Sequence, residues 1–363
     1  MRITRARRLL VLFAITCLLG ASMCANAKSK KGKGCRKVSG SRKKACRKPK
    51  PPRPSPRPSS PPSPLPSPPS PLPSPPSPLP PPPSPLPSPP PPPQVPYMIE
   101  YDIVRTQDWD PSLFTQGLEI AKACADCQTR LFTSSGLTLT GYGAASYIAT
   151  KYLDSGATIA STQLGDSEFG EGVTVLDGKL YQLIFQSNVL KVYDAQSLRL
   201  LETRNHPLSS GWGLTDDGSD LILSDGSSTL IYVNPSNPSS TVKELRVTFQ
   251  GTEVSQLNEL EYIDGFLYAN IWKKNCIAKI DATGEVVGWL DASQLRTMID
   301  ESVSPAKPYE AFDYPLNGVA VFPGAGRTEL AITGKYWNKL FRIRETGTTA
   351  IGDVQAVRDT CMV

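Results

Sequence analysis

The chain has 363 residues, of which 37 are proline, and a formal net charge of +6. Residues 1–96 contain 18 of the 39 basic residues and none of the 33 acidic ones, so residues 97–363 carry an excess of 12 acidic residues. An acidic globular part argues against nucleic-acid binding, and a proline-dominated first part cannot form a packed core.

Residues 1–27 have the pattern of a secretory signal peptide. Four arginines precede the apolar run at residues 9–21, and Ala25-Asn26-Ala27 provides small residues for cleavage. The alternative is a retained membrane anchor, but the apolar run is short for a bilayer span. We therefore expect cleavage and a protein in the secretory pathway, located outside the cell, in the cell wall, or in an endomembrane lumen or the vacuole.

Two further segments precede the globular part. Residues 28–50 are rich in Lys and Arg. Such a run could bind an acidic wall polysaccharide, although a solvated disordered tail is the simpler interpretation. Residues 51–96 repeat Ser-Pro-Pro-Ser-Pro-Leu-Pro, which favours an extended polyproline II rod because proline fixes φ and lacks an amide donor. We expect a semi-rigid spacer similar to the hydroxyproline-rich stalks of plant and algal wall proteins.

Removal of the leader leaves an even number of cysteines, which favours disulfides in an exported chain. The remaining cysteines are Cys35, Cys46, Cys124, Cys127, Cys276 and Cys361. Their connectivity cannot be read from spacing. Cys124 and Cys127 have redox-motif spacing but no surrounding βαβ pattern, so we expect a structural disulfide within this pair or to distant cysteines. His206 is the only histidine, so a zinc site is not expected.

From residue 97 onward, short apolar runs alternate with turn residues. Five stretches share one order of an opening, a strand, an Asp-Gly-type turn and further strands. The openings are Phe114-Thr115-Gln116-Gly117-Leu118, Phe169-Gly170-Glu171-Gly172, Gly211-Trp212-Gly213-Leu214, Leu257-Asn258-Glu259-Leu260 and Leu316-Asn317-Gly318-Val319. Units about 41 to 59 residues apart predict an all-β fold, a five-bladed β-propeller over residues 97–363. A β-sandwich is the alternative, but its turns recur every 8–12 residues or so without a longer repeat.

The propeller prediction brings the five openings together. The first strand of each blade lines the central channel, so the opening residues should converge at one mouth as a concave site. These residues are Gln116, Glu171, Trp212, Asn258 and Asn317. Residues 98–104 are predicted to form the outer strand that closes the ring beside the C-terminal strands, which removes exposed sheet edges.

The chain resembles the plant-type glutaminyl-peptide cyclotransferases (glutamine cyclotransferases). The resemblance covers roughly residues 97–344 and rests on the openings above, together with Ser224-Asp225-Gly226-Ser227 and Ala269-Asn270-Ile271-Trp272. It implies a five-bladed propeller that converts N-terminal glutaminyl residues of peptides and proteins to pyroglutamate with loss of ammonia. It also implies that no metal or other cofactor is required.

The resemblance further implies a set of site residues. Glu171 is expected to be catalytic, and the substrate-binding residues are expected to be Phe114, Gln116, Phe169, Trp212, Asn258, Trp272 and Lys335. Two departures stand out. A position that is typically Trp in the family is Phe185 here, which makes part of an aromatic wall smaller. An insertion with Cys124 and Cys127 lengthens the first blade, and we expect it to affect a loop rather than the channel.

The chemistry of cyclisation suits these residues. The α-amine must attack the side-chain amide carbonyl, and ammonia leaves only after it gains a proton. Glu171 can move that proton if the surrounding aromatic residues raise its pKa. The donors among the site residues can polarise the amide oxygen, and the aromatic residues can enclose the Gln side chain.

Two other functions remain open at this stage. One is a non-catalytic propeller, tethered to the wall by its stalk, that binds peptide or glycan. The other is a metal-dependent propeller hydrolase, which is disfavoured because an inward ring with one clear carboxylate is poor for calcium. We expect the cyclotransferase, acting as a monomer.

Overall fold

The structure is a computed structural model that describes residues 95–140, 143–302, 314–324 and 326–363. The expected leader, the basic tail and most of the proline-rich spacer lie outside the described residues. The described strands belong to one unit, Leu86–Val363. They confirm a mainly β chain, but the all-β prediction missed two short helices, α2 (Ser293–Ser302) and α3 (Val354–Cys361). No helix in the described ranges is long and apolar enough to span a membrane.

Three four-stranded antiparallel sheets form in chain order within the described ranges. The first contains β2 (Thr115–Lys122), β3 (Thr129–Thr140), β4 (Gly143–Tyr152) and β5 (Thr158–Gln163). The second contains β6 (Gly170–Leu176), β7 (Lys179–Ile184), β8 (Val189–Asp194) and β9 (Leu200–Asn205). The third contains β10 (Leu214–Asp216), β11 (Leu221–Leu223), β12 (Thr229–Asn234) and β13 (Asn237–Arg246). Each is a set of consecutive strands, as the repeat pattern predicts.

The other strands form a sheet of eight and a short hairpin in this part of the chain. The hairpin is β14 (Thr248–Phe249) with β15 (Thr252–Glu253). One half of the large sheet is β16 (Leu257–Ile263), β17 (Phe266–Ile271), β18 (Cys276–Ile280) and β19 (Val286–Asp291). The other half is β20 (Leu316–Val321), β21 (Glu329–Gly334) and β22 (Lys339–Ala350), with β1 (Tyr97–Asp108) between the halves.

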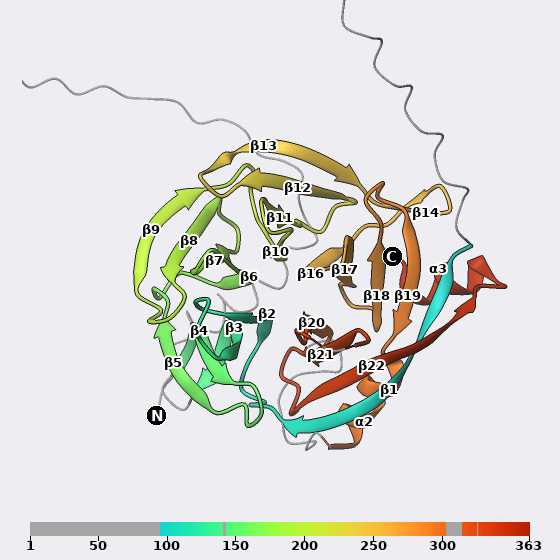
Figure 1. Ribbon diagram of the computed structural model, residues 1–363, viewed down its shortest axis with the longest axis horizontal. Coiled ribbons are helices and arrows are strands. Elements are labelled where there is room, and N and C mark those ends of the chain that lie inside the picture. Colours follow the sequence, from blue (N-terminus) through green and yellow to red (C-terminus); the bar gives the residue numbers. More distant parts are fainter. Residues whose placement is uncertain (1–94, 141–142, 303–313, 325) are drawn as a thin grey trace, which may run out of the picture. The chain divides into compact units, whose positions relative to one another are not determined.

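Strand β1 joins the N-terminal end of the described chain to its C-terminal strands (Figure 1). It pairs antiparallel with β22 from Tyr97 opposite Ala350 to Asp108 opposite Lys339. It also pairs parallel with β19 at Tyr97 and Met98. The predicted closing strand at residues 98–104 lies within β1, and its pairing beside the C-terminal strands is confirmed.

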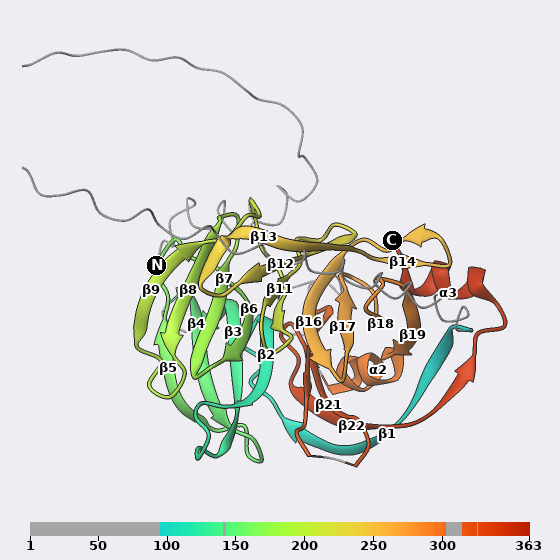
Figure 2. The ribbon, with the colours of Figure 1, turned by 45° about the horizontal axis from the view of Figure 1, so that its top comes forward.

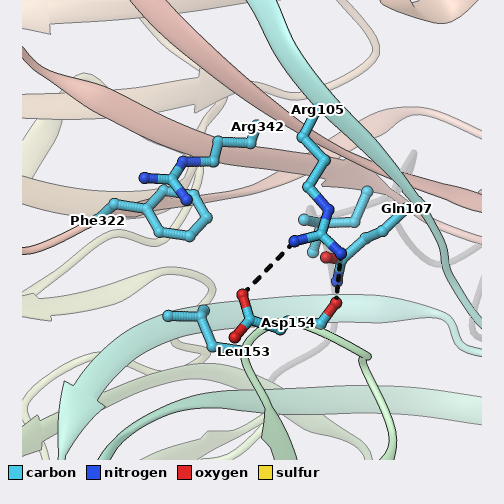
Figure 3. Close-up of a pocket in the computed structure, with 7 residues that line it drawn as sticks. Arg105, Gln107, Leu153, Asp154, Phe322 and Arg342 are labelled. Carbon is cyan, nitrogen blue, oxygen red and sulfur yellow. Dashed lines mark hydrogen bonds and ion pairs between the residues drawn. The ribbon is translucent and has the colours of Figure 1, made fainter.

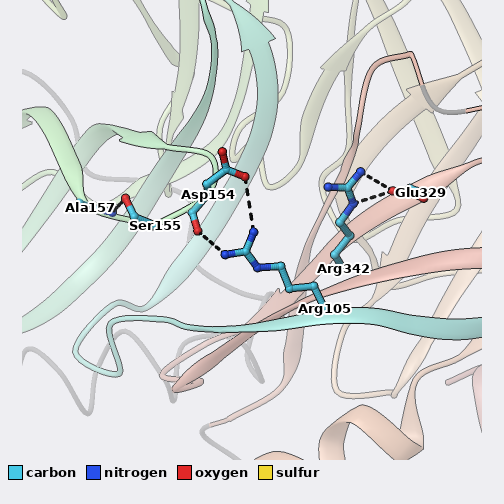
Figure 4. A network of polar contacts seen from close by, with 6 residues as sticks. All are labelled: Arg105, Asp154, Ser155, Ala157, Glu329 and Arg342. Atoms are coloured by element: carbon cyan, nitrogen blue, oxygen red, sulfur yellow. Dashed lines mark hydrogen bonds and ion pairs between the residues drawn. The ribbon is translucent and has the colours of Figure 1, made fainter.

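Side chains add contacts where β1 and β22 meet the first sheet. Arg105 donates to the backbone oxygen of Asp154, in the turn between β4 and β5, over 2.9 Å (Figure 3). Arg342 lies over the ring of Phe322 at 4.0 Å and pairs with Glu329 (Figure 4). These contacts border a small pocket lined by Arg105, Gln107, Leu153, Asp154, Phe322, Leu340 and Arg342. None of the candidate site residues lines this pocket.

The first strands of the successive units contact one another in a closed cycle. Strand β2 contacts β6, β6 contacts β10, β10 contacts β16, β16 contacts β20, and β20 returns to β2. These strands lie innermost in Figure 1, with later strands of each unit farther out. The five openings therefore lie on or beside strands that surround a common centre.

Two disulfides form among the described cysteines. Cys276 of β18 is bonded to Cys361, which fastens α3 over the apolar cluster that contains Leu267, Val286 and Trp289. Cys124 is bonded to Cys127 in the turn between β2 and β3, so the insertion does lie in a loop. Cys35 and Cys46 are outside the described residues.

Deleting residues 1–108 removes β1, whereas deleting residues 1–96 leaves it intact. We expect the shorter deletion to melt at the temperature of the full chain. The longer deletion should melt lower by at least about 5 °C, because β22 loses its ladder and the large sheet divides. Thermal melts followed by circular dichroism, run side by side, measure the difference. Equal melting temperatures for the two deletions would contradict the role assigned to β1.

Candidate active site

Four of the five opening residues lie in β-bulges. The pairing register of the first strand shifts at Thr115/Gly117, Gly170/Val173, Leu257/Leu260 and Leu316/Val319. The residues displaced from the ladder include Gln116, Glu171, Asn258 and Asn317. A bulge leaves a residue unpaired and redirects its side chain, and bulges are frequent beside active sites. The fifth opening residue, Trp212, lies two residues before β10 and donates its N–H to the oxygen of Ser224 over 2.8 Å.

Glycine follows four of these five positions because neighbouring first strands approach closely there. A Cβ atom on Gly213 would lie 1.9 Å from the oxygen of Asn258, and one on Gly172 would lie 2.4 Å from the nitrogen of Leu214. Neither contact is possible, so only glycine permits this separation. The fifth position is Glu259, whose carboxylate accepts hydrogen bonds from the backbone of β2 and β20.

Glu171 is the central acid of the site. Its side chain is buried, with 3% exposure, and its Oε1 accepts a hydrogen bond of 2.9 Å from Nε2 of Gln116. Its Oε2 has no hydrogen-bond partner among the described residues. Burial raises the pKa of the carboxyl well above its ordinary value of 4.5, and the nearby Lys335 opposes this only in part. A raised pKa with one free oxygen suits a group that both accepts and returns a proton.

Lys335 is the cation that faces Glu171. It directly follows β21, forms a β-bridge with Phe114, and places Nζ 4.8 Å from the centre of the Phe114 ring. Burial lowers the pKa of Lys335 to about 8, although Glu171 opposes the shift. Both groups are thus moved toward their neutral forms, because the loss of hydration outweighs their mutual attraction.

The expected aromatic residues form two groups of ring contacts. Phe114 lies 5.8 Å from Phe169, and Phe169 lies 5.6 Å from Phe185, measured between ring centroids. Trp212 and Trp272 meet edge to face at 5.6 Å. Phe185 therefore takes part in the wall in spite of its smaller size.

Sequence reasoning missed three residues that shape this wall. Tyr336 extends the first group, with its ring 5.1 Å from that of Phe114. Gly136 leaves room for Phe169, since a Cβ there would lie 2.3 Å from the ring. Gly226, with φ of +85°, leaves room for Trp212 in the same way. Of these three residues, only Gly226 had a signal in the sequence, because it belongs to the motif Ser224-Asp225-Gly226-Ser227.

Asn258 brings an open acceptor to the site. Its side chain is buried, with 3% exposure, and its Oδ1 has no hydrogen-bond partner in the described part of the chain. Its backbone oxygen accepts from Oγ of Ser224 over 2.7 Å, which ties β16 to the third sheet. An unpaired buried oxygen favours a ligand that brings an N–H group.

A second tier of site residues comes from the ends of the second strands. Phe185 follows β7, Trp272 follows β17 and Lys335 follows β21. Each donates its backbone N–H to the residue just before the facing first strand, namely Phe169, Gln256 and Pro315. The site thus combines the bulges of the first strands with the ends of the second strands.

The interior holds more carboxylates than the one expected. Glu259 accepts from the N–H groups of Leu118 and Val319, and Glu261 accepts from that of Val321. Burial raises the pKa of both carboxyls well above 4.5. Glu119 accepts from Oγ1 of Thr174 over 3.1 Å. Even so, no group of three His, Cys, Asp or Glu residues in the described ranges is arranged to hold a metal ion.

The comparisons with known proteins agree with one another on the family. The model of the family described as glutamine cyclotransferase matches residues 85–345. The chain is 35% identical over 246 residues to a glutaminyl-peptide cyclotransferase of Arabidopsis thaliana, across 68% of this chain and 71% of that protein. It also resembles the crystal structure of a glutaminyl cyclase of Myxococcus xanthus. That match has a TM-score of 0.59 and 31% identity, over 70% of this chain and 99% of the other.

The buried carboxyl of Glu119 should make the protein less stable as the pH rises. Burial, with the nearby Asp216 carboxylate, raises its pKa from 4.5 to about 8. Between these values the folded protein keeps a proton that the unfolded chain has lost, so stability falls with increasing pH. We expect Glu119→Gln to reduce the fall in melting temperature between about pH 5 and pH 8.

Glu329 is the matched control for this titration. Burial would raise its pKa, but hydrogen bonds from Arg344 and Arg342 outweigh burial and lower it. Its stabilising effect is therefore present above pH 4.5 and lost as the pH falls through the lowered pKa. Glu329→Gln should lower the melting temperature near neutral pH and leave the decline above pH 5 in place. An unchanged pH slope in Glu119→Gln would contradict the prediction.

Proposed function

The chain belongs to the glutamine cyclotransferase family, and we propose that Glu171 transfers the proton in its reaction. It is a glutaminyl-peptide cyclotransferase, which converts N-terminal glutaminyl residues of peptides and proteins to pyroglutamate and releases ammonia. The observation that carries the proposal for Glu171 is its geometry: a buried carboxyl, fixed by Gln116 at 2.9 Å, with its second oxygen open.

The substrate enters as an N-terminal Gln with its side chain among the aromatic residues. Trp212 and Trp272 enclose it on one side, and Phe114 and Phe169 on the other. Enclosure by rigid rings excludes water and favours the folded conformer in which the amine lies near the amide carbon. Asn258 binds the substrate by accepting one of its N–H groups at Oδ1. The absence of a partner for this oxygen in the described part of the chain supports that role.

Ring closure forms a bond between the α-nitrogen and the side-chain carbonyl carbon. The α-amine has an ordinary pKa of about 8, so it loses its ammonium proton readily near neutral pH. Glu171 Oε2 accepts the proton that the α-nitrogen sheds as the bond forms. It then gives this proton to the amide nitrogen, the carbon–nitrogen bond breaks, and ammonia leaves. The carboxylate is regenerated, so one group serves as base and acid.

Negative charge builds up on the amide oxygen during the attack. Lys335 is the buried cation of the site that faces Glu171. Its ammonium form stabilises that negative charge strongly because the surroundings have a low dielectric constant. The lowered pKa of about 8 means that it still carries its proton at neutral pH. Gln116 contributes by holding Glu171, and its second amide N–H remains available to the substrate.

The five units form the blades of a propeller in this proposal. The closed cycle of contacts through β2, β6, β10, β16 and β20 supports it. The last unit takes β1 as its outer strand, in agreement with the pairing of β1 and β22. In such a ring the bulged residues share one mouth, which explains how openings far apart in sequence make one site.

The N-terminal segments give the enzyme its location. We propose secretion through the signal at residues 1–27, and tethering to wall polysaccharide through residues 28–96. The basic composition of residues 28–50 and the proline repeat support this. The globular part acts as a monomer. A non-catalytic binding role is not favoured, since the relatives named above are glutaminyl cyclases.

Glu171→Gln should fold but lose turnover. Gln has nearly the same shape and cannot accept the proton, so we expect kcat to fall by about 10²- to 10⁴-fold. Ammonia release from a Gln-initiated dipeptide measures the rate, and a thermal melt checks the fold. Wild-type kcat in a folded variant would rule out Glu171 as the proton shuttle.

Glu168 provides a matched control close to Glu171 in the chain. Its carboxylate pairs with Lys191 and is partly exposed. Glu168→Gln should therefore leave kcat within about twofold of the wild type, since surface ion pairs contribute little. A large loss in this variant would show that the assay responds to general damage in the segment before β6.

Chelation should leave the activity intact. The proposed chemistry uses a carboxyl and an ammonium group, and each is supplied by the protein. We expect full ammonia release after prolonged treatment with EDTA or phenanthroline. Loss of activity that zinc or calcium restores would mean that a metal takes part in the reaction.

A further inference from the structure

Asn317 connects the last unit to the first, because it hydrogen-bonds to Gln116, the residue that donates to Glu171. It lies in the bulge of β20 and is fully buried. Its Nδ2 donates to the backbone oxygen of Thr115 over 3.0 Å, and to both the backbone oxygen and Oε1 of Gln116 over 3.4 Å. Three acceptors surround Nδ2, so the amide of Asn317 cannot turn its oxygen toward them without repulsion.

This fixed amide determines the orientation of the next one. Because Asn317 donates to Oε1 of Gln116, the NH₂ group of Gln116 must face the other way, where it donates to Glu171. A turned Gln116 would present its oxygen to Glu171. Only a protonated carboxyl can donate to that oxygen, whereas an ionised one would be repelled. The chain of amides thus favours the carboxylate form.

We propose that Asn317 is a positioning residue that orients the Gln116 amide and thereby keeps Glu171 in its proton-accepting form. The inference rests on the proposed role of Glu171 and extends it by two residues. It explains why a fully buried asparagine occupies the fifth bulge.

Among the charged groups near Glu171, Lys335 acts in the same direction as the oriented Gln116 amide. Lys335 is the charged group that acts on Glu171, and it favours the ionised form. Glu259, on the first strand β16, is occupied by the N–H groups of Leu118 and Val319. Burial opposes ionisation of Glu171 throughout. Without the oriented Gln116, Lys335 alone would have to offset the loss of hydration.

Removing the Nδ2 donor should shift the acidic limb of the pH profile. In Asn317→Ala and in the similarly sized Asn317→Leu, we expect the limb of kcat to move upward by about one pH unit. This corresponds to an about tenfold loss of kcat on the acidic limb that disappears where the profile reaches its plateau, with KM changed less than kcat. Ammonia release from one Gln-initiated dipeptide across the pH range provides the measurement.

The control is Thr333→Val, which also removes a buried hydrogen bond from this sheet. Oγ1 of Thr333 donates to the oxygen of Lys339, with no link to Glu171. This variant should lose stability but keep the wild-type pH profile. A matching shift in Thr333→Val, or an equal loss at every pH in both Asn317 variants, would overturn the proposal. If Asn317→Ala does not fold, Asn317→Ser provides the small side chain at this site.

A double-mutant cycle with Gln116→Met tests the path of the effect. If Asn317 acts through the Gln116 amide, replacing it should cause no further pH shift in the Gln116→Met background. Additive shifts would overturn the proposal. If the proposed role of Glu171 is itself wrong, the result is different. Glu171→Gln would then retain turnover, whatever the Asn317 variants do.

Discussion

Two hydrogen bonds made by one buried carboxylate hold the centre of the protein together. Glu259 of β16 accepts from the N–H of Leu118 on β2 and from that of Val319 on β20, over 3.0 and 2.8 Å. Both N–H groups belong to strands at the edges of their sheets, β2 and β20, and a buried N–H without a partner is costly. One side chain from the fourth unit therefore satisfies the backbone of the first and the last.

The same bulges place the reactive groups, so the closed centre and the site are one structure. Glu171 and Gln116 meet because β2 and β6 are held close by Gly117, where a Cβ would lie 2.6 Å from Val173. Such a site is rigid before substrate arrives, and preorganised groups are the ones that stabilise a transition state at least cost. Burial then moves the pKa of Glu171 up and that of Lys335 down to about 8, which brings both toward the pH range in which an α-amine is reactive.

Sequence reasoning was sufficient for most of the strands, whereas it missed residues such as Tyr336 that pack beside the candidate site. The predicted closing strand at residues 98–104 lies within β1, and consecutive strands follow the openings as the repeat predicts, because apolar runs between turn residues leave little choice. The two helices were not predicted from the sequence, because each is short and depends on tertiary contacts. α3, for example, is capped by Asp353 and fastened by the Cys276–Cys361 disulfide, and neither is visible as periodicity. The roles of Glu259 and Asn317 depend on bulges and on contacts about 60 to 200 residues apart, which no local pattern reports.

These observations also explain why the openings differ so much in residue type while the backbone repeats. The position after each bulge must be small or must bond to backbone, as with Gly172 and Glu259, because neighbouring strands touch there. The bulged residue itself is displaced from the ladder, so its side-chain type is not restricted in this way. It is Gln, Glu, Asn and Asn in four units, and in the third unit, where β10 pairs without a register shift, Trp212 stands before the strand. A repeated backbone can therefore carry five independent choices of side chain, and the reaction depends on their combination and not on any one repeat.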